Sequence, residues 1–518
     1  MSRHRLRRCA SALCALALAT ACTPDVPARP PLRILASTDL ADMQPILDDL
    51  RRETGVAVRV DYRPGVDTSP LPTADQPYDL AWLSSGGYLQ LVLNDPDHPA
   101  PAPISTPIML SPVVVGVTPE AGAKLRRQAA GAPLTWADVA DGAAAGTLRL
   151  AMADPRGSGA ALPALVGVAT AAAGTGAALR PEDVTCDRLR GFLSGQTLSA
   201  PSSAALVDSF VARQDDVEAL IGHEATLLSL NASGKLRRPL EIVYPADGIV
   251  QSDHPLVLLD QAERARYDTV VSWLRSNQVQ ERISQRTLRR PVNPASRRDP
   301  RLTGSIGTAL YFPDQRAVVD TLLEKYADPK LRRPGRVIFV LDYSGSMRGA
   351  RISALRDAFA GLSGADRTHR GKFFRFYRGE RFTVVQFGGR VLRERNFTVE
   401  SQRDLDALRD FVGSGQFDAD TAVWSALSHA YREAIESDGD RSVAVVLMTD
   451  GENNAGIGPE EFLRTVRRGG RSVPVFAIRY GEADPVELAR VARATGGRMV
   501  DATRSSLLDA FGDIRGCY

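Results

Sequence analysis

Short apolar runs alternate with helical periodicities along most of the chain. In the C-terminal part, residues 337–341 form a continuous apolar run, which is typical of a strand buried on both faces of a parallel sheet. The next segment places Ile352, Leu355 and Phe359 at helical spacing. Further strands are expected at residues 382–387, 442–448, 475–479 and 498–500. Strands that alternate with helices of about a dozen residues predict a doubly wound α/β sheet that holds its ligand at the carboxyl ends of the strands.

The N-terminal part, residues 32–300, shows a similar alternation with shorter strands. Residues 32–36 form an apolar strand, and residues 56–62 and 79–83 form the next two. Between the first two strands, a helical segment carries its apolar side chains on one face, at Leu40, Met43, Ile46, Leu47 and Leu50. This region is therefore also predicted to be α/β.

Small hydroxyl residues follow two of these strands. Ser37 and Thr38 end the first strand, and Ser84 and Ser85 end the third. In open α/β sheets, the carboxyl ends of strands and the free amides of helix N-termini face one crevice, where they hold ligands. Each of these serines taken alone is better explained as a helix N-cap without any ligand.

Later segments make this pattern more specific. A long strand covers residues 107–117. The sequence DPRGSG, at residues 154–159, follows another strand, and YPADG lies within residues 240–250. This arrangement resembles the extracellular solute-binding proteins of bacterial uptake systems. The resemblance implies two lobes of a periplasmic-binding-protein-like α/β fold, joined by crossover strands near 107–117 and 240–250. It also implies a ligand cleft lined by Ser37, Thr38, Ser84, Ser85, Ser158 and Tyr244.

Hydroxyls and helix-end amides in such a cleft favour an oxyanion or a small polar solute. Lobes that have lost their ligand and serve as a scaffold also fit the sequence. Residues 301–335 are interpreted as a linker with a short helix, because residues 315–326 place Val318, Val319, Leu322 and Leu323 on one side.

An all-oxygen set of side chains follows the strands of the C-terminal part, residues 336–518. Asp342, Ser344 and Ser346 come directly after the first strand, Thr421 precedes a helix, and Asp450 ends a later strand. The set contains no histidine and no thiol. Hard oxygen ligands suit Mg²⁺ or Mn²⁺ and argue against Zn²⁺.

The DxSxS sequence, Thr421 and the Thr449-Asp450-Gly451 turn resemble the metal-ion-dependent adhesion site (MIDAS) of von Willebrand factor A (vWA) domains, which have a Rossmann-like fold. The resemblance implies direct ligation by Ser344 and Ser346, and by Thr421 in an open form. Asp342 and Asp450 would act directly or through water. The sequence departs from the family at Asp418-Ala419-Asp420-Thr421, where a glycine commonly precedes the threonine. The alternative is that Asp342 and Asp450 have a purely structural role and cap turns.

The N-terminus has the pattern of an export signal. Four arginines lie within residues 3–8, an uncharged stretch of small and apolar residues follows at 9–21, and Cys22 comes next. The segment resembles a bacterial lipoprotein signal, which implies lipidation of Cys22 and anchoring on the outer face of the cell membrane. A plain cleaved signal, giving a secreted or periplasmic protein, is the alternative. Residues 22–31 are proline-rich and are expected to form an extended tether.

Two cysteines, Cys186 and Cys517, remain after the signal and Cys22. An exported protein meets oxidising conditions, so a disulfide between them is one possibility. Two buried free thiols are the other, because the sequence does not show that the two positions approach each other.

Composition and charge exclude several classes of protein. Of 518 residues, 44% are hydrophobic and 24% are charged, as in an ordinary globular protein. The formal net charge is +3 and includes four arginines of the signal, so nothing points to nucleic acid as a partner. No phosphate-binding loop, HExxH zinc helix or GxSxG nucleophile elbow is present.

These observations predict a binding protein of the cell surface and not an enzyme. In the favoured hypothesis, Mg²⁺ or Mn²⁺ at the C-terminal site binds an acidic side chain of a partner protein. The alternative hypothesis is a receptor of an uptake system that binds a small polar or oxyanion solute and uses the vWA domain as a docking module. In both, the chain contacts the membrane through its lipid anchor alone.

Overall fold

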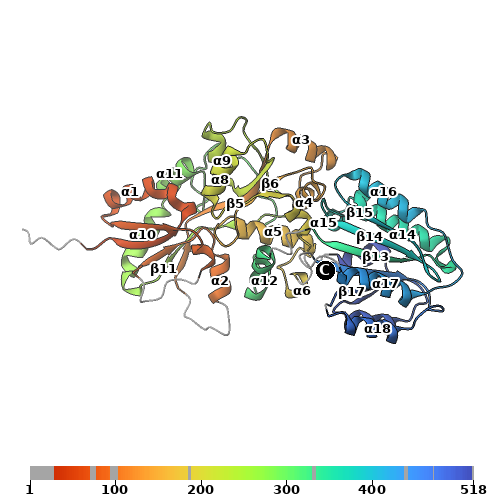
Figure 1. The fold of residues 1–518 in the computed structure, drawn as a ribbon. Helices are drawn as coiled ribbons and strands as arrows, with labels where there is room; N and C mark the ends of the chain where they lie inside the picture. Colours follow the sequence, from red (N-terminus) through yellow and green to blue (C-terminus); the bar gives the residue numbers. More distant parts are fainter. Residues whose placement is uncertain are drawn as a thin grey trace, which may run out of the picture.

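The computed structural model describes residues 29–69, 77–93, 103–184, 188–328, 334–436, 442–470 and 472–515. The chain forms three α/β units in a row, each built on its own sheet (Figure 1). The first two units are called lobe one and lobe two, and the third is called the C-terminal domain. Among the described residues, no helix is long and apolar enough to cross a membrane.

Lobe one is a five-stranded mixed sheet with the order β2-β1-β3-β11-β4. β1, β2 and β3 are parallel, and β11 is antiparallel to its neighbours β3 and β4. The strands are β1 (Leu32–Ser37), β2 (Val58–Arg63), β3 (Leu80–Trp82), β4 (Ser105–Pro107) and β11 (Pro255–Leu258). An apolar core on this sheet includes residues of the helices α1 (Gln44–Thr54), α10 (Arg264–Leu274) and α11 (Asn277–Thr287).

Lobe two is built around the long strand β5 (Met109–Val117), which pairs with β8, β9, β10 and β12. The remaining strands are β6 (Leu150–Ala151), β7 (Gln196–Leu198), β8 (Ala219–His223), β9 (Glu241–Val243), β10 (Gln251–Ser252) and β12 (Arg290–Pro291). Its helices are α3 (Pro119–Gln128), α4 (Trp136–Ala144), α5 (Ala161–Ala173), α6 (Pro181–Val184), α7 (Arg190–Ser194), α8 (Ser203–Ala212) and α9 (Glu224–Ala232).

The chain crosses between the lobes three times. It leaves lobe one at Ile108, between β4 and β5, and returns at residues 253–254, between β10 and β11. It crosses again after α11, because β12 pairs with β5 in lobe two. The return crossing therefore lies a few residues after the range 240–250 expected from the sequence, and the third crossing was not anticipated.

The C-terminal domain is a six-stranded sheet with the order β15-β14-β13-β16-β17-β18. All neighbouring strands are parallel except the edge strand β15, which is antiparallel to β14. The strands are β13 (Arg336–Asp342), β14 (Arg381–Phe387), β15 (Val391–Thr398), β16 (Val443–Thr449), β17 (Val475–Arg479) and β18 (Met499–Asp501). Successive side chains of a strand point to opposite faces, so β13 and β16, which are almost entirely buried, require cover on both faces.

Each face of this sheet has its own apolar core. Phe339 of β13 lies in one core, with helices α14 (Ala350–Ala360), α16 (Gln402–Gly413) and α20 (Leu507–Ile514). Its neighbours Ile338 and Val340 point into the other core, with α17 (Val423–Glu436), α18 (Pro459–Arg468) and α19 (Pro485–Ala494). The α/β class, the two-lobed N-terminal region and the doubly wound C-terminal sheet predicted from the sequence are therefore confirmed.

The C-terminal domain packs on lobe two through α15 (His369–Phe374), which lies against α4 (Figure 1). Lys372 Nζ donates to Asp138 Oδ1 at 2.6 Å, and Arg375 Nη1 donates to Asp141 Oδ1 at 2.6 Å. The Arg375 and Asp141 side chains are 8% and 7% exposed, so this ion pair is almost dry. Lobe two and the C-terminal domain therefore share a charged, mostly buried interface.

Candidate functional site

Two buried aspartates lie at the carboxyl edge of the C-terminal sheet. Asp342 ends β13, and Asp450 follows β16, which pairs in parallel with β13. Carboxyl ends of neighbouring parallel strands meet at one edge, and both side chains are fully buried there. Asp342 is held from two sides, because the Ser344 amide donates to Oδ1 at 2.7 Å and the Thr449 hydroxyl donates to Oδ2 at 2.6 Å.

Hydroxyl groups connect this edge into one chain of oxygens. Ser344 Oγ and Ser346 Oγ lie 3.0 Å apart, and Ser346 Oγ donates to Asp450 Oδ1 at 2.9 Å. Thr421 lies at the same place, because a Cβ added at Gly451 would be 3.7 Å from both Thr421 Oγ1 and Ser346 Oγ. The structure therefore brings all five residues of the predicted metal set to one edge of the sheet.

The threonine loop, residues 418–421, is fixed by residues that the sequence did not indicate. Asn454 Oδ1 accepts from the Thr421 amide at 2.7 Å, and the Asn454 amide donates to the Thr421 carbonyl at 3.0 Å. Asp418 is held by a 3.0 Å bond from its amide to the Tyr343 carbonyl, which ties the acidic residues of this loop to the strand end. The signal that could have indicated Asn454 is its position four residues after Asp450, in the turn that follows β16.

Arg351 was also missed, and it changes the charge of the site. Its guanidinium, at the start of α14, forms an ion pair with Asp450 Oδ2. Burial, with a smaller contribution from the Asp450 carboxylate, outweighs the hydrogen bonds from Thr449 and Ser344 and raises the pKa of Asp342 to about 6. A dry pair of carboxylates stabilises any cation placed between them, and Arg351 already supplies one positive charge to Asp450.

The donor set fits a hard divalent ion. It contains two carboxylates and three hydroxyls, which are the oxygen ligands that Mg²⁺ and Mn²⁺ prefer. Among the residues that the structure describes, no group of three or more His, Cys, Asp or Glu side chains has the arrangement of a metal site. The chemistry of this edge is therefore that of a hydroxyl-rich site and not that of a carboxylate or histidine cage.

The serines predicted to line the cleft converge on a carboxylate of the chain itself. Ser37 Oγ donates to Asp67 Oδ2 at 2.9 Å, and the Ser84 and Ser85 amides approach Asp67 Oδ1 at 2.5 and 3.3 Å. Ser84 Oγ also donates to Ser37 Oγ at 2.9 Å. The hydroxyls and amides expected to hold an oxyanion thus hold Asp67, which was missed because it lies in a three-residue 3-10 turn (Val66–Thr68) without periodicity.

Lobe two closes directly over this group. A Cβ added at Gly159 would lie 2.3 Å from Ser84 Cβ and 2.8 Å from Asp67 Oδ2, so the two lobes are in contact there. Ser158 does not reach the other serines by a hydrogen bond in the structure, but shares one of 2.6 Å with Ser203 of lobe two. Thr38 Oγ1 is buried without a hydrogen-bond partner among the described residues.

Tyr244 belongs to a different group of side chains. Its hydroxyl donates to Glu224 Oε1 at 2.5 Å, and the fully buried Glu224 is bound by Arg290 through two bonds of 2.7 Å. This cluster ties α9 to the third crossing between the lobes. Its contacts are those of a structural ion pair.

The seam between the lobes is acidic. Burial and, to a smaller extent, the neighbouring carboxylate of Asp39 raise the pKa of Asp67 to about 7. Burial also raises the pKa of Asp39, whose Oδ2 lies 3.9 Å from His223 Nδ1. Burial and the charge of Arg289 lower the pKa of His223 to about 3, so this histidine is neutral. The seam therefore holds two buried carboxyl groups, a neutral histidine and the positive charge of Arg289.

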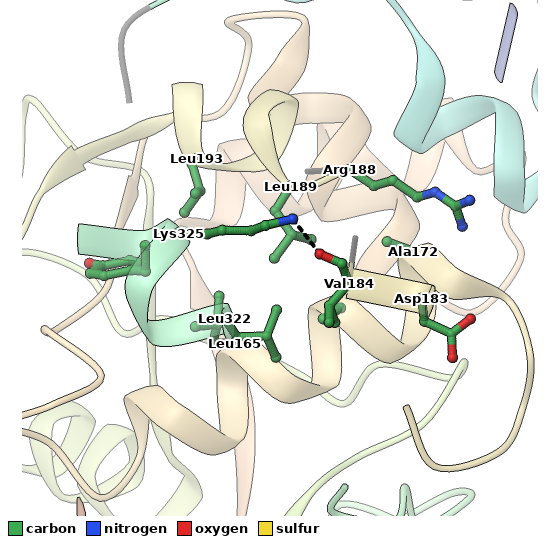
Figure 2. Close-up of a pocket in the computed structure, with 11 residues that line it drawn as sticks. Leu165, Ala172, Asp183, Val184, Arg188, Leu189, Leu193, Leu322 and Lys325 are labelled. Atoms are coloured by element: carbon green, nitrogen blue, oxygen red, sulfur yellow. Dashed lines mark hydrogen bonds between the residues drawn. The ribbon is translucent and has the colours of Figure 1, made fainter. Parts of the chain in front are cut away.

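A small pocket in lobe two lies between α5, α6, α7 and the linker helix α12 (Arg316–Ala327) (Figure 2). Leu165 and Leu322 are among its apolar lining residues, and Lys325 Nζ donates to the Val184 carbonyl. Its volume of about 20 Å³ is that of a single water molecule. The pocket is therefore a packing defect under α12 and not a ligand site.

The three cysteines of interest, Cys22, Cys186 and Cys517, lie outside the described residues. Lipidation of Cys22 and the state of the other two therefore stay predictions.

Comparisons with known proteins assign both halves. Residues 32–286 match the family described as bacterial extracellular solute-binding protein, and residues 337–513 match the von Willebrand factor type A domain. A human protein, inter-alpha-trypsin inhibitor heavy chain H1, is 26% identical over 154 residues, which is 28% of this chain and 16% of that protein. The chain therefore spans a small part of that relative's length.

Solved structures similar to the chain include two binding proteins. One is the periplasmic binding protein AfuA from Actinobacillus pleuropneumoniae, with exogenous fructose-6-phosphate bound, at 17% identity and a TM-score of 0.41 over 57% of this chain and 98% of that one. The other is iron-bound HitA from Pseudomonas aeruginosa, at 14% identity and a TM-score of 0.42 over 58% and 100%. By the two family matches, residues 32–286 of this protein are a solute-binding-protein region, and residues 337–513 are a von Willebrand factor type A domain.

Proposed function

We propose that this protein is an exported bacterial surface protein whose vWA domain binds a partner protein through Mg²⁺ or Mn²⁺. The ligands are Asp342, Ser344, Ser346, Thr421 and Asp450. The observation that carries the proposal is the convergence of these side chains from three distant segments at one edge of the sheet, where hydrogen bonds link the four residues other than Thr421.

The charge of the site supports an anionic partner. Asp342 and Asp450 balance one divalent ion, so a further carboxylate is attracted and not repelled. When bound, Mg²⁺ or Mn²⁺ supplies a positive centre for an oxygen ligand from outside the chain. Ser346 is exposed, and Thr421 is 5% exposed, so the hydroxyl side of the site is the side that faces a partner. An acidic side chain of the partner is the group that fits this position.

The solute-binding region acts as a support in this proposal. Asp67 takes the hydroxyls and amides that would hold an oxyanion, and Gly159 of lobe two closes over it. These contacts favour the scaffold hypothesis over a receptor that transfers a small solute to an uptake system. The export signal at residues 1–21 and lipidation of Cys22 would place the protein on the outer face of the membrane.

Metal binding is tested by calorimetric titration of the full chain with MgCl₂ and MnCl₂. Ser346→Ala removes one exposed donor hydroxyl and is expected to weaken binding of both ions about tenfold. Ser353→Ala, on the exposed face of α14, is the matched control and should bind both ions as the wild type does. Absence of heat with either ion, or identical affinities in both variants, would show that this edge is not a metal site.

Partner binding is tested separately, because metal binding alone does not establish it. Envelope proteins captured by the wild type in Mg²⁺ should be released by a chelator and should not be captured by Ser346→Ala. Substitution of single acidic residues in a captured partner then identifies the carboxylate. Capture that persists in a chelator would contradict the proposed mechanism.

A further inference from the structure

A cavity of about 360 Å³ lies in the interface between lobe two and the vWA domain. Lobe two contributes Gln128, Ala144 and Thr147, near the C-terminal ends of α3 and α4. The vWA domain contributes Arg367 and Arg375, which flank α15, and Arg378 just beyond them. Cavities at domain interfaces in this range of volume are common positions for small ligands.

Positive charge dominates the walls of this cavity. Three arginines line it, and Glu400 is the one acidic side chain among its described lining residues. Arg378 Nε lies 3.5 Å from Glu400 Oε2, and both side chains are more than half exposed. Asp141, behind the wall, accepts from Arg375 and lies 3.5 Å from Arg367 Nη1. The two acids leave a net charge of +1 among these five groups.

Arg375 has an unsatisfied donor at this position. The residue is 7% exposed, and its Nε is buried without a hydrogen-bond partner among the described residues. A buried donor of a charged group is costly to leave unpaired, so an acceptor is expected beside it. Its Nη1 is taken by Asp141, which fixes the plane of the guanidinium.

The rest of the wall combines polar side chains with the apolar residues Phe376, Val399 and Leu405. The Thr147 hydroxyl donates to the Gly142 carbonyl at 3.2 Å, so the donors available to an anion here are those of the arginines. The stem of Arg378 lies over Gly146, where a Cβ would be 2.6 Å from Arg378 Cδ, so the glycine allows this arginine to approach lobe two. The Arg378 amide also donates to the Ala144 carbonyl at 2.9 Å, which fixes the two walls to each other.

From this geometry we infer that the interface between lobe two and the vWA domain binds a small phosphate-bearing anion. Guanidinium groups bind phosphate oxygens through two parallel N–H donors, and Arg367 and Arg378 carry such groups on exposed, adjustable side chains. Because both units form the wall, the ligand bridges them and strengthens their contact. This site is separate from the metal edge, which is the end of the C-terminal sheet that carries Asp342, Ser344, Ser346, Thr421 and Asp450. The inference does not depend on the proposed function.

The test is titration of the full chain with inorganic phosphate and with pyrophosphate, at constant ionic strength and with EDTA present. EDTA removes any contribution of a bound metal. The double variant R367Q/R378Q is expected to lose affinity about tenfold or more, because it removes two charged donors. Arg264→Gln is the matched control, since Arg264 is also half exposed and paired with one carboxylate, Asp268. If the double variant does not fold, the single variant Arg378→Gln replaces it in the titration.

A second arm uses vesicles of phosphatidylglycerol, which separate a lipid headgroup from a soluble phosphate. Vesicle binding that is lost in the double variant, without binding of soluble phosphate, supports the site and assigns the phosphate to a lipid. Binding of soluble phosphate lost in the double variant supports the site and assigns a soluble ligand. No binding in either arm at millimolar phosphate, or equal binding by wild type and double variant, would overturn the inference.

Discussion

The guanidinium of Arg351 is paired with the carboxylate of Asp450 at the centre of the metal edge. Asp450 is fully buried, whereas the Arg351 side chain is 33% exposed and enters from the first turn of α14. A positive side chain therefore occupies one oxygen of a proposed metal ligand. The pair makes Arg351 a competitor of the ion, and its movement away is part of metal binding in our proposal.

Removal of this competitor should strengthen metal binding. Arg351→Gln is expected to lower the dissociation constant for Mg²⁺ about threefold to tenfold, because a partly exposed ion pair of about 1 kcal/mol no longer has to be broken. Arg351→Lys keeps the charge and should stay near the wild-type value. Calorimetric titration of both variants measures the difference. Weaker binding by Arg351→Gln would show that the arginine positions Asp450 for the ion and does not compete with it.

The threonine loop should be sensitive to one glycine. A Cβ added at Gly388 would lie 2.3 Å from Asp418 Cβ, and the Gly388 carbonyl accepts from the Ala422 amide at 2.7 Å. Gly388→Ala is therefore expected to push the loop outward and move Thr421 away from Ser346. We expect a loss of metal affinity of about tenfold and a loss of stability of about 1–3 kcal/mol from overpacking.

The control for that variant is Gly458→Ala, because a Cβ there meets nothing within 4 Å. It should change neither the metal affinity nor the midpoint of urea unfolding by much. Unchanged metal affinity in Gly388→Ala, with the expected loss of stability, would show that Thr421 is not a ligand. That outcome would leave the other four donors in place.

The metal edge was predicted from the sequence because its parts are local to strand ends. An apolar run followed by Asp342-Tyr343-Ser344-Gly345-Ser346 fixes both the strand and its exit, and Thr449-Asp450-Gly451 does the same for β16. Parallel pairing of β13 and β16 then brings the two exits together. The contact of Arg351 with Asp450 could not be predicted in this way, because the position of a residue on a helix does not show which strand end it meets.

The lobe seam illustrates the opposite case. Ser37, Ser84 and Ser85 were found at strand ends, but their partner Asp67 lies in a short turn that shows no periodic pattern. The contact of Gly159 with Ser84 depends on how far the lobes have closed, which the spacing of residues does not determine. The contact between α4 and α15 was missed for the same reason, since more than two hundred residues separate Asp141 from Arg375.

Asp67 should make the solute-binding region less stable as the pH rises. Its folded pKa of about 7 exceeds the ordinary value of 3.8, so the folded chain holds the proton more tightly than the unfolded chain. The stability that this proton contributes is present below about pH 4 and is lost as the pH rises through about 7. The carboxylate is then left charged in the seam, beside Asp39.

Asp67→Asn removes this dependence while keeping the shape of the side chain. Relative to wild type, the variant should gain stability between pH 4 and 7, by up to a few kcal/mol, and the gain should level off above pH 7. The difference between the two urea-unfolding curves therefore reports the titration of Asp67 together with its electrostatic coupling to Asp39. A difference that does not change with pH would mean that Asp67 keeps an ordinary pKa in the seam.

The interface between lobe two and the vWA domain should depend on one buried acid. Asp141 is 5% exposed and accepts from Arg375, which is 7% exposed, and it also lies 3.5 Å from Arg367 Nη1. Asp141→Asn leaves the guanidinium of Arg375 buried without its counter-charge, which costs about 3–5 kcal/mol in a dry pair. The first unfolding transition in urea should therefore shift to markedly lower concentration.

The matched control for Asp141→Asn is Asp268→Asn. Asp268 is paired with Arg264 on the surface of α10, where both side chains are about half exposed, and such pairs contribute about 0–1 kcal/mol. If the interface holds the two units together, Asp141→Asn should also expose the linker at residues 301–335 to limited proteolysis, whereas Asp268→Asn should not. Equal, small effects of both variants would mean that the vWA domain and lobe two are joined by their linker and not by α15.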